Sequence, residues 1–479
     1  MSSLLALYST AANGLDAFQS ALNVIQNNVD NSSTPGFATQ GINLEAQPLD
    51  IASGLAGGVA ARGLKNSRDT YLEEAVQAQT QTLGFYTSQA QSTSSIQSFF
   101  DVTDTSGVSA ALNQLFQSFS AWSTTPSDSS AQQNVIASAS GVADAVNSLA
   151  NSLSQTSAQI DGQMSSTVSQ INQITATIQQ YNIQKLQQPD AAPDPGQDAQ
   201  LYSALQNLSQ LVNFSTVTQS DGTVTVMLSG GTPLVIGKNQ FNLSTADFVD
   251  PQPPPVNPQS PPSAHILDSE GDDVTSQITS GQLGGLLDTR NRVLASMMGN
   301  AQQQGSLNQF AQSLADTVNQ ILESGTVSAT AGASKGSPLF TYDASNPTGV
   351  AATLAVNPQI TPAELAPVDS SGNANGNANA LAALANASSS TIDGMSLTQF
   401  FGQLAASAGQ ENQTATDNEQ SQQQVVAQAE SLRDKVSGVS LDEQAADVLQ
   451  YQRAYQATAQ VLTVLDTLAQ TVLNLVQPV

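Results

Sequence analysis

Both ends of this 479-residue chain carry the same sequence pattern, in which apolar residues recur at steps of three or four. Steps that average 3.5 residues put apolar side chains along one face of an α-helix, where a second helix can pack. Because these segments lie at opposite ends of the sequence, pairing them would close the whole chain into a long hairpin. The first segment, 1–31, contains Leu4, Tyr8, Ala11, Leu15, Phe18, Leu22, Ile25 and Val29, and the second, 440–476, contains Val448, Tyr455, Leu462, Leu465, Ala469, Val472 and Val476.

The apolar faces of these two terminal helices are wider than one partner helix can cover. In the second helix, Val461, Val464 and Leu468 lie beside the main seam. Pairing with a single helix would leave that surface exposed. We therefore expect the two helices to pack among many copies of the chain. In an isolated monomer, residues 1–31 and 450–479 should be disordered or sensitive to protease.

Helical periodicity also dominates the middle of the chain. The pattern from about Asp128 to Leu186 is longer than a usual globular helix and indicates a coiled-coil-like rod. The period changes to two only around 223–243, after the hairpin signal Asp221-Gly222, and a Pro-rich extended linker follows at 250–264. We predict a mainly α fold, in which both chain ends and the middle helices form a long coiled-coil-like helical bundle with small β-hairpin inserts.

These patterns divide the chain into seven segments. In chain order they are an N-terminal assembly helix with a connecting segment (1–68), the first part of a helical rod (69–213), a β-hairpin insert with the Pro-rich linker (214–280), a return helix of the rod (281–324), a small exposed insert (325–395), the last part of the rod (396–436) and a C-terminal assembly helix (437–479).

The charge of the chain excludes two classes of partner. It has 38 acidic and 11 basic residues, a formal net charge of −27. Such a field repels nucleic acid and anionic membranes, so we expect neither nucleic-acid binding nor membrane insertion. No apolar run reaches the roughly 20 residues that span a bilayer. The first basic residue is Arg62, so we expect no cleavable signal peptide, which needs a basic segment before its apolar stretch.

Charged residues are also scarce, at 10% of the chain against roughly 25% in ordinary domains. Weakly charged helices rich in Gln, Asn and Ser can pack against copies of themselves with little cost of charge desolvation. A composition bias shared by the whole lineage is the alternative explanation. The absence of cysteine excludes disulfides and thiolate sites.

No group of residues supports catalysis, and we predict no catalytic, cofactor-binding or metal site. The single histidine, His265, falls in the Pro-rich linker, where we expect it to be solvated. The glycines and lysine of 230–238 have the wrong spacing for a phosphate-binding loop. The acidic residues of 268–273 do not follow the alternating spacing of a calcium loop, so we interpret them as a solvated turn.

Short motifs border the two terminal helices. Residues 27–37, NNVDNSSTPGF, resemble the N-terminal motif of bacterial flagellar rod, hook and hook-associated proteins. Residues 437–443 (SGVSLDE) and 451–457 (YQRAYQA) are similar to the ending of the flagellar hook-associated protein 1 family, although hook and rod proteins have a related ending. The residues that match are Asn27, Asn28, Thr34, Pro35, Gly36, Phe37, Gly438, Leu441, Asp442, Glu443, Gln452 and Tyr455.

The layout between the motifs resembles the same family. A long helix opening at 125–128 and another opening at 283–287 lie as in its members. Hook and rod proteins are instead mostly β-structured between their ends. The resemblance departs at 325–395, where family members usually carry a larger outer domain.

The resemblance implies a structural protein, without cofactor, that is exported through the flagellar type III apparatus and polymerises as a short extracellular ring between hook and filament. Its implied partners are copies of itself, the hook protein, the second junction protein or filament, and an export chaperone at the C-terminal helix. Two alternatives stay open: another flagellar axial protein of the hook or distal rod, and a non-flagellar secreted coiled-coil or adhesin-like protein.

Overall fold

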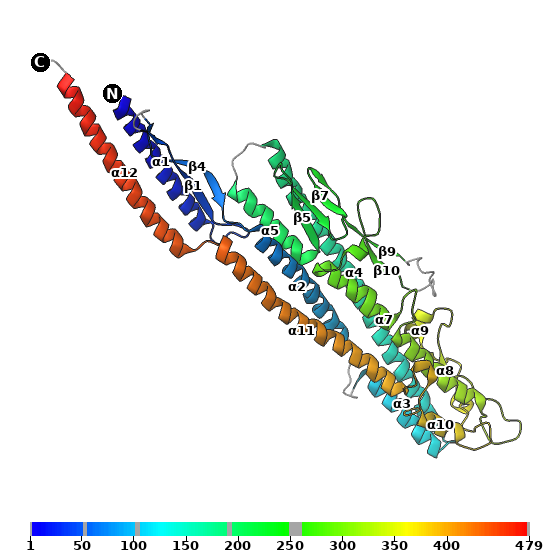
Figure 1. Ribbon diagram of the computed structural model, residues 1–479. Helices are drawn as coiled ribbons and strands as arrows, with labels where there is room; N and C mark the ends of the chain where they lie inside the picture. The colour runs from blue at the N-terminus through cyan, green and yellow to red at the C-terminus, as the bar shows by residue number, and fades with distance from the viewer. Residues whose placement is uncertain (1, 51–54, 101–105, 189–193, 249–260, 477–479) are drawn as a thin grey trace.

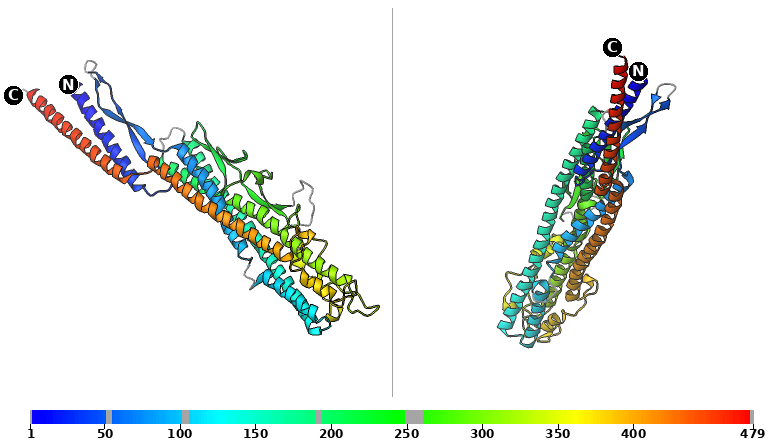
Figure 2. Two further views of the ribbon diagram at one scale, coloured as in Figure 1. Left: turned by 60° about the horizontal axis from the view of Figure 1, so that its bottom comes forward. Right: turned by 90° about the vertical axis from the view of Figure 1, so that its left-hand side faces the viewer.

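The chain folds into a long rod with both of its ends at the same tip (Figures 1 and 2). The computed structural model describes residues 2–50, 55–100, 106–188, 194–248 and 261–476. At the tip, α1 (Ser2–Asp30) and α12 (Leu441–Val476) lie side by side and antiparallel. A β-ribbon of β1 (Gln40–Ala46) and β4 (Val59–Asn66), extended by β2 (Leu49–Asp50) and β3 (Leu55–Ala56), packs on α1.

Long helices form the rod. Capping side chains fix where several of them begin: Asp69 accepts hydrogen bonds from the first turn of α2, Asp128 from that of α4, and Ser396 forms a capping box with Gln399 at α11. α11 runs antiparallel along α2. The rod helices are α2 (Thr70–Gln97), α3 (Gly107–Thr124), α4 (Ser129–Gln187), α5 (Pro195–Leu211), α6 (Gly281–Asp288), the π-helix η2 (Thr289–Leu294), α7 (Ala295–Met298), α8 (Ser306–Ser324) and α11 (Leu397–Ser437).

One face of α4 supplies much of the rod core. Its buried residues recur at helical spacing, so a single apolar stripe runs along the whole helix. From its N-terminal to its C-terminal end this stripe packs against α3, α6 and α5, which makes the core long and thin. The fully buried members include Val135, Val142, Val146, Leu153, Ile171 and Ile178.

A small four-stranded antiparallel sheet lies against α4 near its C-terminal end. Asn182 of α4 ties the sheet down, because its side chain donates to Val224 O and Gly237 O and accepts from Val224 N. The strands are β5 (Phe214–Thr218), β6 (Val224–Leu228), β7 (Pro233–Ile236) and β8 (Asn239–Gln240), followed by the separate pair β9 (Ser244–Phe248) and β10 (Ser263–Leu267). The mainly α fold with small β inserts is thus confirmed.

The prediction of an exposed insert at 325–395 is wrong. Its apolar residues are buried against α3, α4 and α8 and belong to the main core; Leu339, Leu354, Leu365, Leu381 and Ile392 are each at most 1% exposed. Single apolar residues between Gly, Asn and Ser form no period, so the sequence pattern hides this packing. The elements here are β11 (Phe340–Thr341), β12 (Ala355–Val356), α9 (Val350–Thr353), α10 (Gly376–Ala383) and the short 3-10 turns η3 (Pro347–Gly349), η4 (Pro362–Glu364) and η5 (Ser390–Ile392).

The return helix expected over 281–324 is interrupted. The chain leaves helical geometry at Gly299 (φ 90°) and resumes it after Gly305 (φ 84°). A Cβ at Gly299 would lie 2.2 Å from the Gln304 carbonyl oxygen, so this turn needs glycine for both its backbone angle and its space. The long helix expected to open at 125–128 begins at Ser129, with Asp128 as its cap.

Replacing Leu153, which is fully buried on α4, by alanine should lower the free energy of unfolding of the rod by about 2–5 kcal/mol. Urea unfolding followed by the fluorescence of Trp122, the single tryptophan and itself fully buried, measures this loss. Leu186→Ala is the matched control. Leu186 lies on the same helix but is 42% exposed, so the loss should be about 0.5 kcal/mol. Equal losses for both variants would contradict a continuous core along α4.

Candidate assembly site at the paired chain ends

The two terminal helices meet along a seam of seven positions of α12 that alternate at steps of four and three. Phe18 of α1 lies against Tyr451, with ring centroids 6.4 Å apart. Gly14 faces Thr458 in this seam, where a Cβ would be in ordinary van der Waals contact with Thr458 Cγ2 at 3.4 Å. All seven positions are buried or half-buried: Gln444, Val448, Tyr451, Tyr455, Thr458, Leu462 and Leu465.

On α1, the residues expected in the seam divide into two groups. Ile25 is buried, and Leu4, Leu15, Phe18 and Leu22 are half-buried. Val29 is 41% exposed, and on α12 Val472 is 46% exposed, so the structure places these two outside the seam. Alanines fill other buried positions: Ala11, which the periodic pattern includes, and Ala17 and Ala21, which it does not. Their small side chains let the α1 backbone pack closely against its neighbours.

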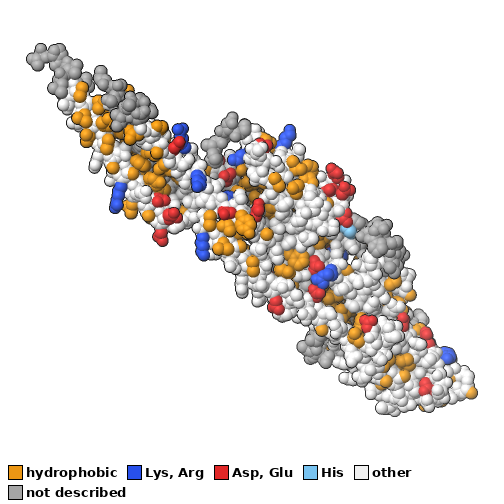
Figure 3. All heavy atoms as spheres, viewed as in Figure 1, with side chains coloured by type: hydrophobic (Ala, Val, Ile, Leu, Met, Phe, Trp, Pro, Cys, Tyr) orange, Lys and Arg blue, Asp and Glu red, His pale blue; other side chains and the backbone are white. Residues whose placement is uncertain are grey.

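A second apolar stripe on α12 stays about half exposed in the part of the chain that the structure describes. Val461, Val464 and Leu468 are 53%, 58% and 50% exposed, with Val472 one turn further on. On α1, Leu5 and Tyr8 are also exposed. Figure 3 shows the resulting gathering of apolar side chains on the terminal pair. Large contiguous apolar patches are rare on monomeric proteins and mark surfaces that bind a partner.

A buried trio of amides holds the inner end of this pair. Asn28 Nδ2 donates to Gln40 O (2.8 Å) and to Gln444 Oε1 (2.9 Å), and Asn28 Oδ1 accepts from Gln40 N (2.9 Å). All three residues are at least 94% buried. The trio therefore joins α1, strand β1 and α12 at one point. Buried polar groups that satisfy one another in this way fix the register of paired helices.

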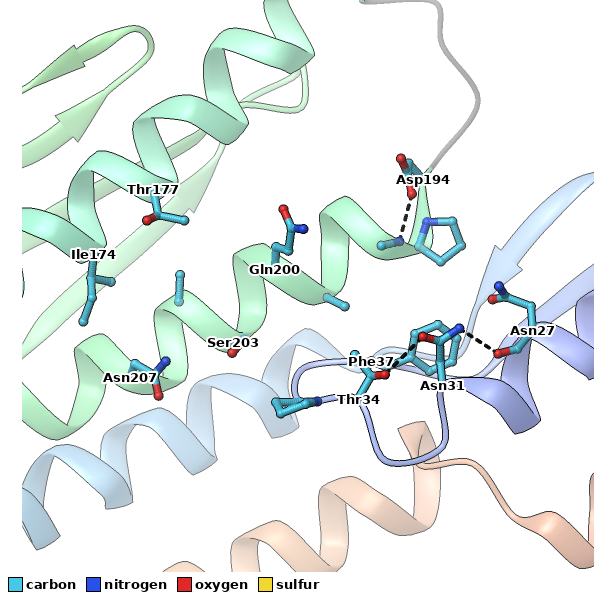
Figure 4. Close-up of a pocket in the computed structure, with 15 residues that line it drawn as sticks. Asn27, Asn31, Thr34, Phe37, Ile174, Thr177, Asp194, Gln200, Ser203 and Asn207 are labelled. Carbon is cyan, nitrogen blue, oxygen red and sulfur yellow. Dashed lines mark hydrogen bonds between the residues drawn. The ribbon is translucent and has the colours of Figure 1, made fainter.

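The Thr-Pro-Gly turn after α1 rests directly on α5 of the rod (Figure 4). Within the turn, Asn31 donates to Asn27 O and Thr34 donates to Asn31 Oδ1. Gly36 has φ +75°, and a Cβ there would lie 2.3 Å from Ala199 O. Only glycine fits this approach. Beside the turn, α4 and α5 line a cleft of about 610 Å³ with mixed polar and apolar walls.

Backbone hydrogen bonds join three chain segments where the terminal pair meets the rod. Thr39 donates from its backbone N–H to Ser437 O (2.8 Å) and from Oγ1 to Gly438 O (2.7 Å). Ser67 N donates to Thr39 O (2.9 Å), which adds the segment that leads from β4 to α2. At Gly438 a Cβ would lie 2.4 Å from Asp434 O, which explains the glycine of the C-terminal motif.

A buried arginine, Arg68, lies at the centre of this joint. Its guanidinium donates to Gly36 O (2.6 Å), pairs with Glu73 and stacks over the ring of Tyr202, 3.7 Å from the ring centroid. Glu73 also faces Arg433 of α11, at 3.9 Å. Burial raises the pKa of the Tyr202 hydroxyl, with the charge of Arg68 opposing that shift, so the ring stays neutral.

The motif residues thus fall into two classes. Asn28, Gly36 and Gly438 have a structural role at the joint, and Phe37 is half-buried beside it. Tyr455 is half-buried in the seam. The others are exposed on the same segments: Asn27, Thr34, Pro35, Leu441, Asp442, Glu443 and Gln452. Sequence reasoning missed Gln40, Arg68 and Gln444. Of these, Gln444 could have been found, because it continues the spacing of Val448, Tyr451 and Tyr455 by one further turn.

The structure corrects the prediction for His265. It lies in strand β10, is 93% buried, and its Nδ1 is 2.8 Å from Asp273 Oδ2, so it is not a solvated linker residue. Asp268 organises the neighbouring acidic turn by accepting hydrogen bonds from the backbone N–H groups of Glu270 and Asp272.

In the part of the chain that the structure describes, no cluster of His, Cys, Asp or Glu could hold a metal ion. Among the same residues, no helix is long and apolar enough to cross a membrane.

A helical rod whose two ends pair at one tip, and whose tip carries an unpartnered apolar stripe, is the subunit of a larger structural assembly. Comparison with known proteins agrees. The profile of the helical domain of flagellar hook-associated protein FlgK matches residues 93–340, and profiles of the flagellar basal body rod FlgEFG protein C-terminal region and of flagella basal body rod proteins match 433–475 and 9–37. This chain belongs to the FlgK family of flagellar hook-associated proteins.

Known relatives extend this assignment over the whole chain. Flagellar hook-associated protein 1 of Bacillus subtilis is 25% identical over 506 residues, which cover 97% of each chain. That of Salmonella typhimurium is 26% identical over 324 residues, covering 65% of this chain and 56% of the relative. The flagellar hook junction protein FlgK from Burkholderia pseudomallei shares the fold, with a TM-score of 0.61 at 17% identity over 77% of this chain and all of that one.

The family defines the role of the chain in general terms. It is a structural component of the bacterial flagellum at the junction of hook and filament, in a family of structural proteins rather than enzymes. It assembles with other axial proteins of the flagellum, with which it shares the two terminal regions.

Asn28→Ala should destabilise the terminal pair by about 1–3 kcal/mol. It leaves the backbone N–H and carbonyl of Gln40 and the side-chain oxygen of Gln444 buried without their partner. Hydrogen exchange of the first turns of α12 measures this loss. The neighbouring Asn27→Ala is the control, since the Asn27 side chain is exposed and only its backbone carbonyl is used. If both variants exchange alike, the amide trio does not hold the pair together.

Proposed function

We propose that copies of this chain polymerise through their terminal helix pairs into a short ring between hook and filament. The observation that carries the proposal is the stripe of Val461, Val464, Leu468 and Val472, which is apolar, continuous and about half exposed among the described residues. Apolar surface removed from water on association is the main driving force for such contacts. The family profiles at both ends support a shared mode of axial assembly.

The charge distribution favours packing at this tip. The chain as a whole carries a net charge of −27, yet residues 2–15 have no charged side chain and residues 454–472 have only Asp466. Exposed charges separated by more than about 10 Å are largely screened at physiological salt. Neighbouring tips can therefore approach although the rods repel one another.

A closed ring needs two different contact surfaces on each copy, one for each neighbour. The terminal pair offers both, since α12 exposes its stripe and α1 exposes Leu5 and Tyr8. The hook protein would contact one face of the finished ring, and the second junction protein or the filament the other. The weakly charged helices of the rod would then pack with little charge desolvation.

Before assembly the same stripe is an aggregation hazard. We expect a cytoplasmic chaperone to cover α12 until export, which would proceed through the flagellar type III apparatus. In the free monomer the two terminal helices are folded against each other. On this proposal residues 1–31 and 450–479 are nevertheless cleaved by protease more readily than the rod, and they become protected in the ring. These statements rest on the exposed stripe and on the family, and limited proteolysis before and after polymerisation tests them.

The variant Val464→Asp/Leu468→Asp should prevent polymerisation without unfolding the rod. Each carboxylate would have to be buried unpaired in the ring, at a cost of several kcal/mol, so the critical concentration should rise at least about tenfold. Sedimentation and electron microscopy of the purified chain measure it. Gln456→Asp/Gln460→Asp adds the same charge to exposed positions of the same helix outside the stripe and should assemble normally. Assembly of the stripe variant at the wild-type concentration would contradict the proposal.

A strain that lacks this protein should retain hooks, lack filaments and release unpolymerised flagellin into the medium. Electron microscopy of the cell surface and an assay of secreted flagellin check this outcome, with the wild-type gene restored as control. Loss of the hooks themselves would place the protein in the hook or rod instead. Secretion of the protein without the flagellar export apparatus would point to a non-flagellar role.

A further inference from the structure

The direction in which the terminal pair leaves the rod is not set by a continuous helix. α11 ends at Ser437 and α12 begins at Leu441, with Gly438 between them in extended geometry. In the described residues, α1 and α12 pack mainly on each other, and α1 also on the β-ribbon, with no extensive contact to the rod helices. The angle of the pair must therefore be determined at the joint itself.

Arg68 is the side chain that connects the separate parts of this joint. Arg68 directly precedes the cap residue of α2 and lies outside both α1 and α2. Its side chain is only 5% exposed. Its donation to Gly36 O holds the turn that ends α1, while its contacts with Glu73 and the Tyr202 ring hold α2 and α5. One guanidinium thus joins the terminal pair to two rod helices at once.

We propose that Arg68 is the positioning residue that fixes the angle between the terminal helix pair and the rod. Arginine suits this task because its planar fork donates in two fixed directions while its face stacks on an aromatic ring. Gly36 contributes as well, because the turn can pack against α5 only if residue 36 has no Cβ. The inference concerns a single chain, so it does not depend on the proposed ring.

The absence of native cysteine allows a direct measurement of this angle. Spin labels at Gln424→Cys on α11 and Gln460→Cys on α12, both exposed, would lie roughly 50 Å apart by helical rise. Pulsed electron paramagnetic resonance on the monomer should give one narrow distance distribution. Arg68→Met in the same labelled chain should broaden that distribution at least about twofold, because the turn is released from α2 and α5.

Arg62→Met is the matched control. Arg62 pairs with Glu45 within the β-ribbon and is mostly exposed, so its loss should leave the distance distribution unchanged. A distribution for Arg68→Met as narrow as the wild type, with the same mean, would overturn the proposal. If Arg68→Met fails to fold, as judged from Trp122 fluorescence, the same distance measurement is made on the variant Tyr202→Leu. It removes the stacked ring and keeps the ion pair, and an unchanged distribution for that variant would equally overturn the proposal.

Failure of this inference can be told apart from failure of the proposed function. The distance measurement uses monomers, whereas polymerisation is measured by sedimentation. A chain that polymerises normally with an unrestrained angle would contradict only the role of Arg68. A chain with a fixed angle that never polymerises would contradict only the ring.

Discussion

The pairing of α1 with α12 is the contact on which the rest of the molecule depends. Asn28 and Gln444, which meet in it, are 416 residues apart in the sequence. Closing so long a loop costs conformational entropy before any contact is gained. The rod reduces that cost, because the antiparallel packing of α2 and α11 holds Ser67 and Ser437 within hydrogen-bonding distance. With the rod in place, the two terminal helices start close together, so that pairing them closes only short additional loops.

The helices and the terminal seam could be predicted because periodic apolar residues show them directly. The packing of 325–395 could not, since isolated apolar residues there form no period. The burial of His265 was also hidden, because the strand that contains it follows a Pro-rich stretch. The joint escaped prediction for a different reason. Arg68, Gln40 and Gln444 act through polar contacts that follow no sequence period, some of them with distant residues, such as Gln444 with Asn28. The sequence pattern around a single polar residue does not identify its partner.

The tip has two kinds of surface, and they have different roles in assembly. The amide trio and the seam are satisfied within one chain, so they define the shape of the subunit. The stripe from Val461 to Val472 remains about half exposed among the described residues, so it is available to neighbours. Separating the two lets the subunit fold correctly before it joins others. The scarcity of charge near the tip keeps the second surface open to close contact despite the acidity of the whole chain.

The joint also has a mechanical consequence. Two backbone connections run between the terminal module and the rod, one through Ser67 and one through Gly438, and hydrogen bonds from Thr39 tie them together. A pulling or twisting force along the rod is therefore shared by two covalent paths in parallel. The hydrogen bonds between the two paths hold them together at the joint. Such an arrangement suits a subunit placed where torque passes from one tubular segment to the next.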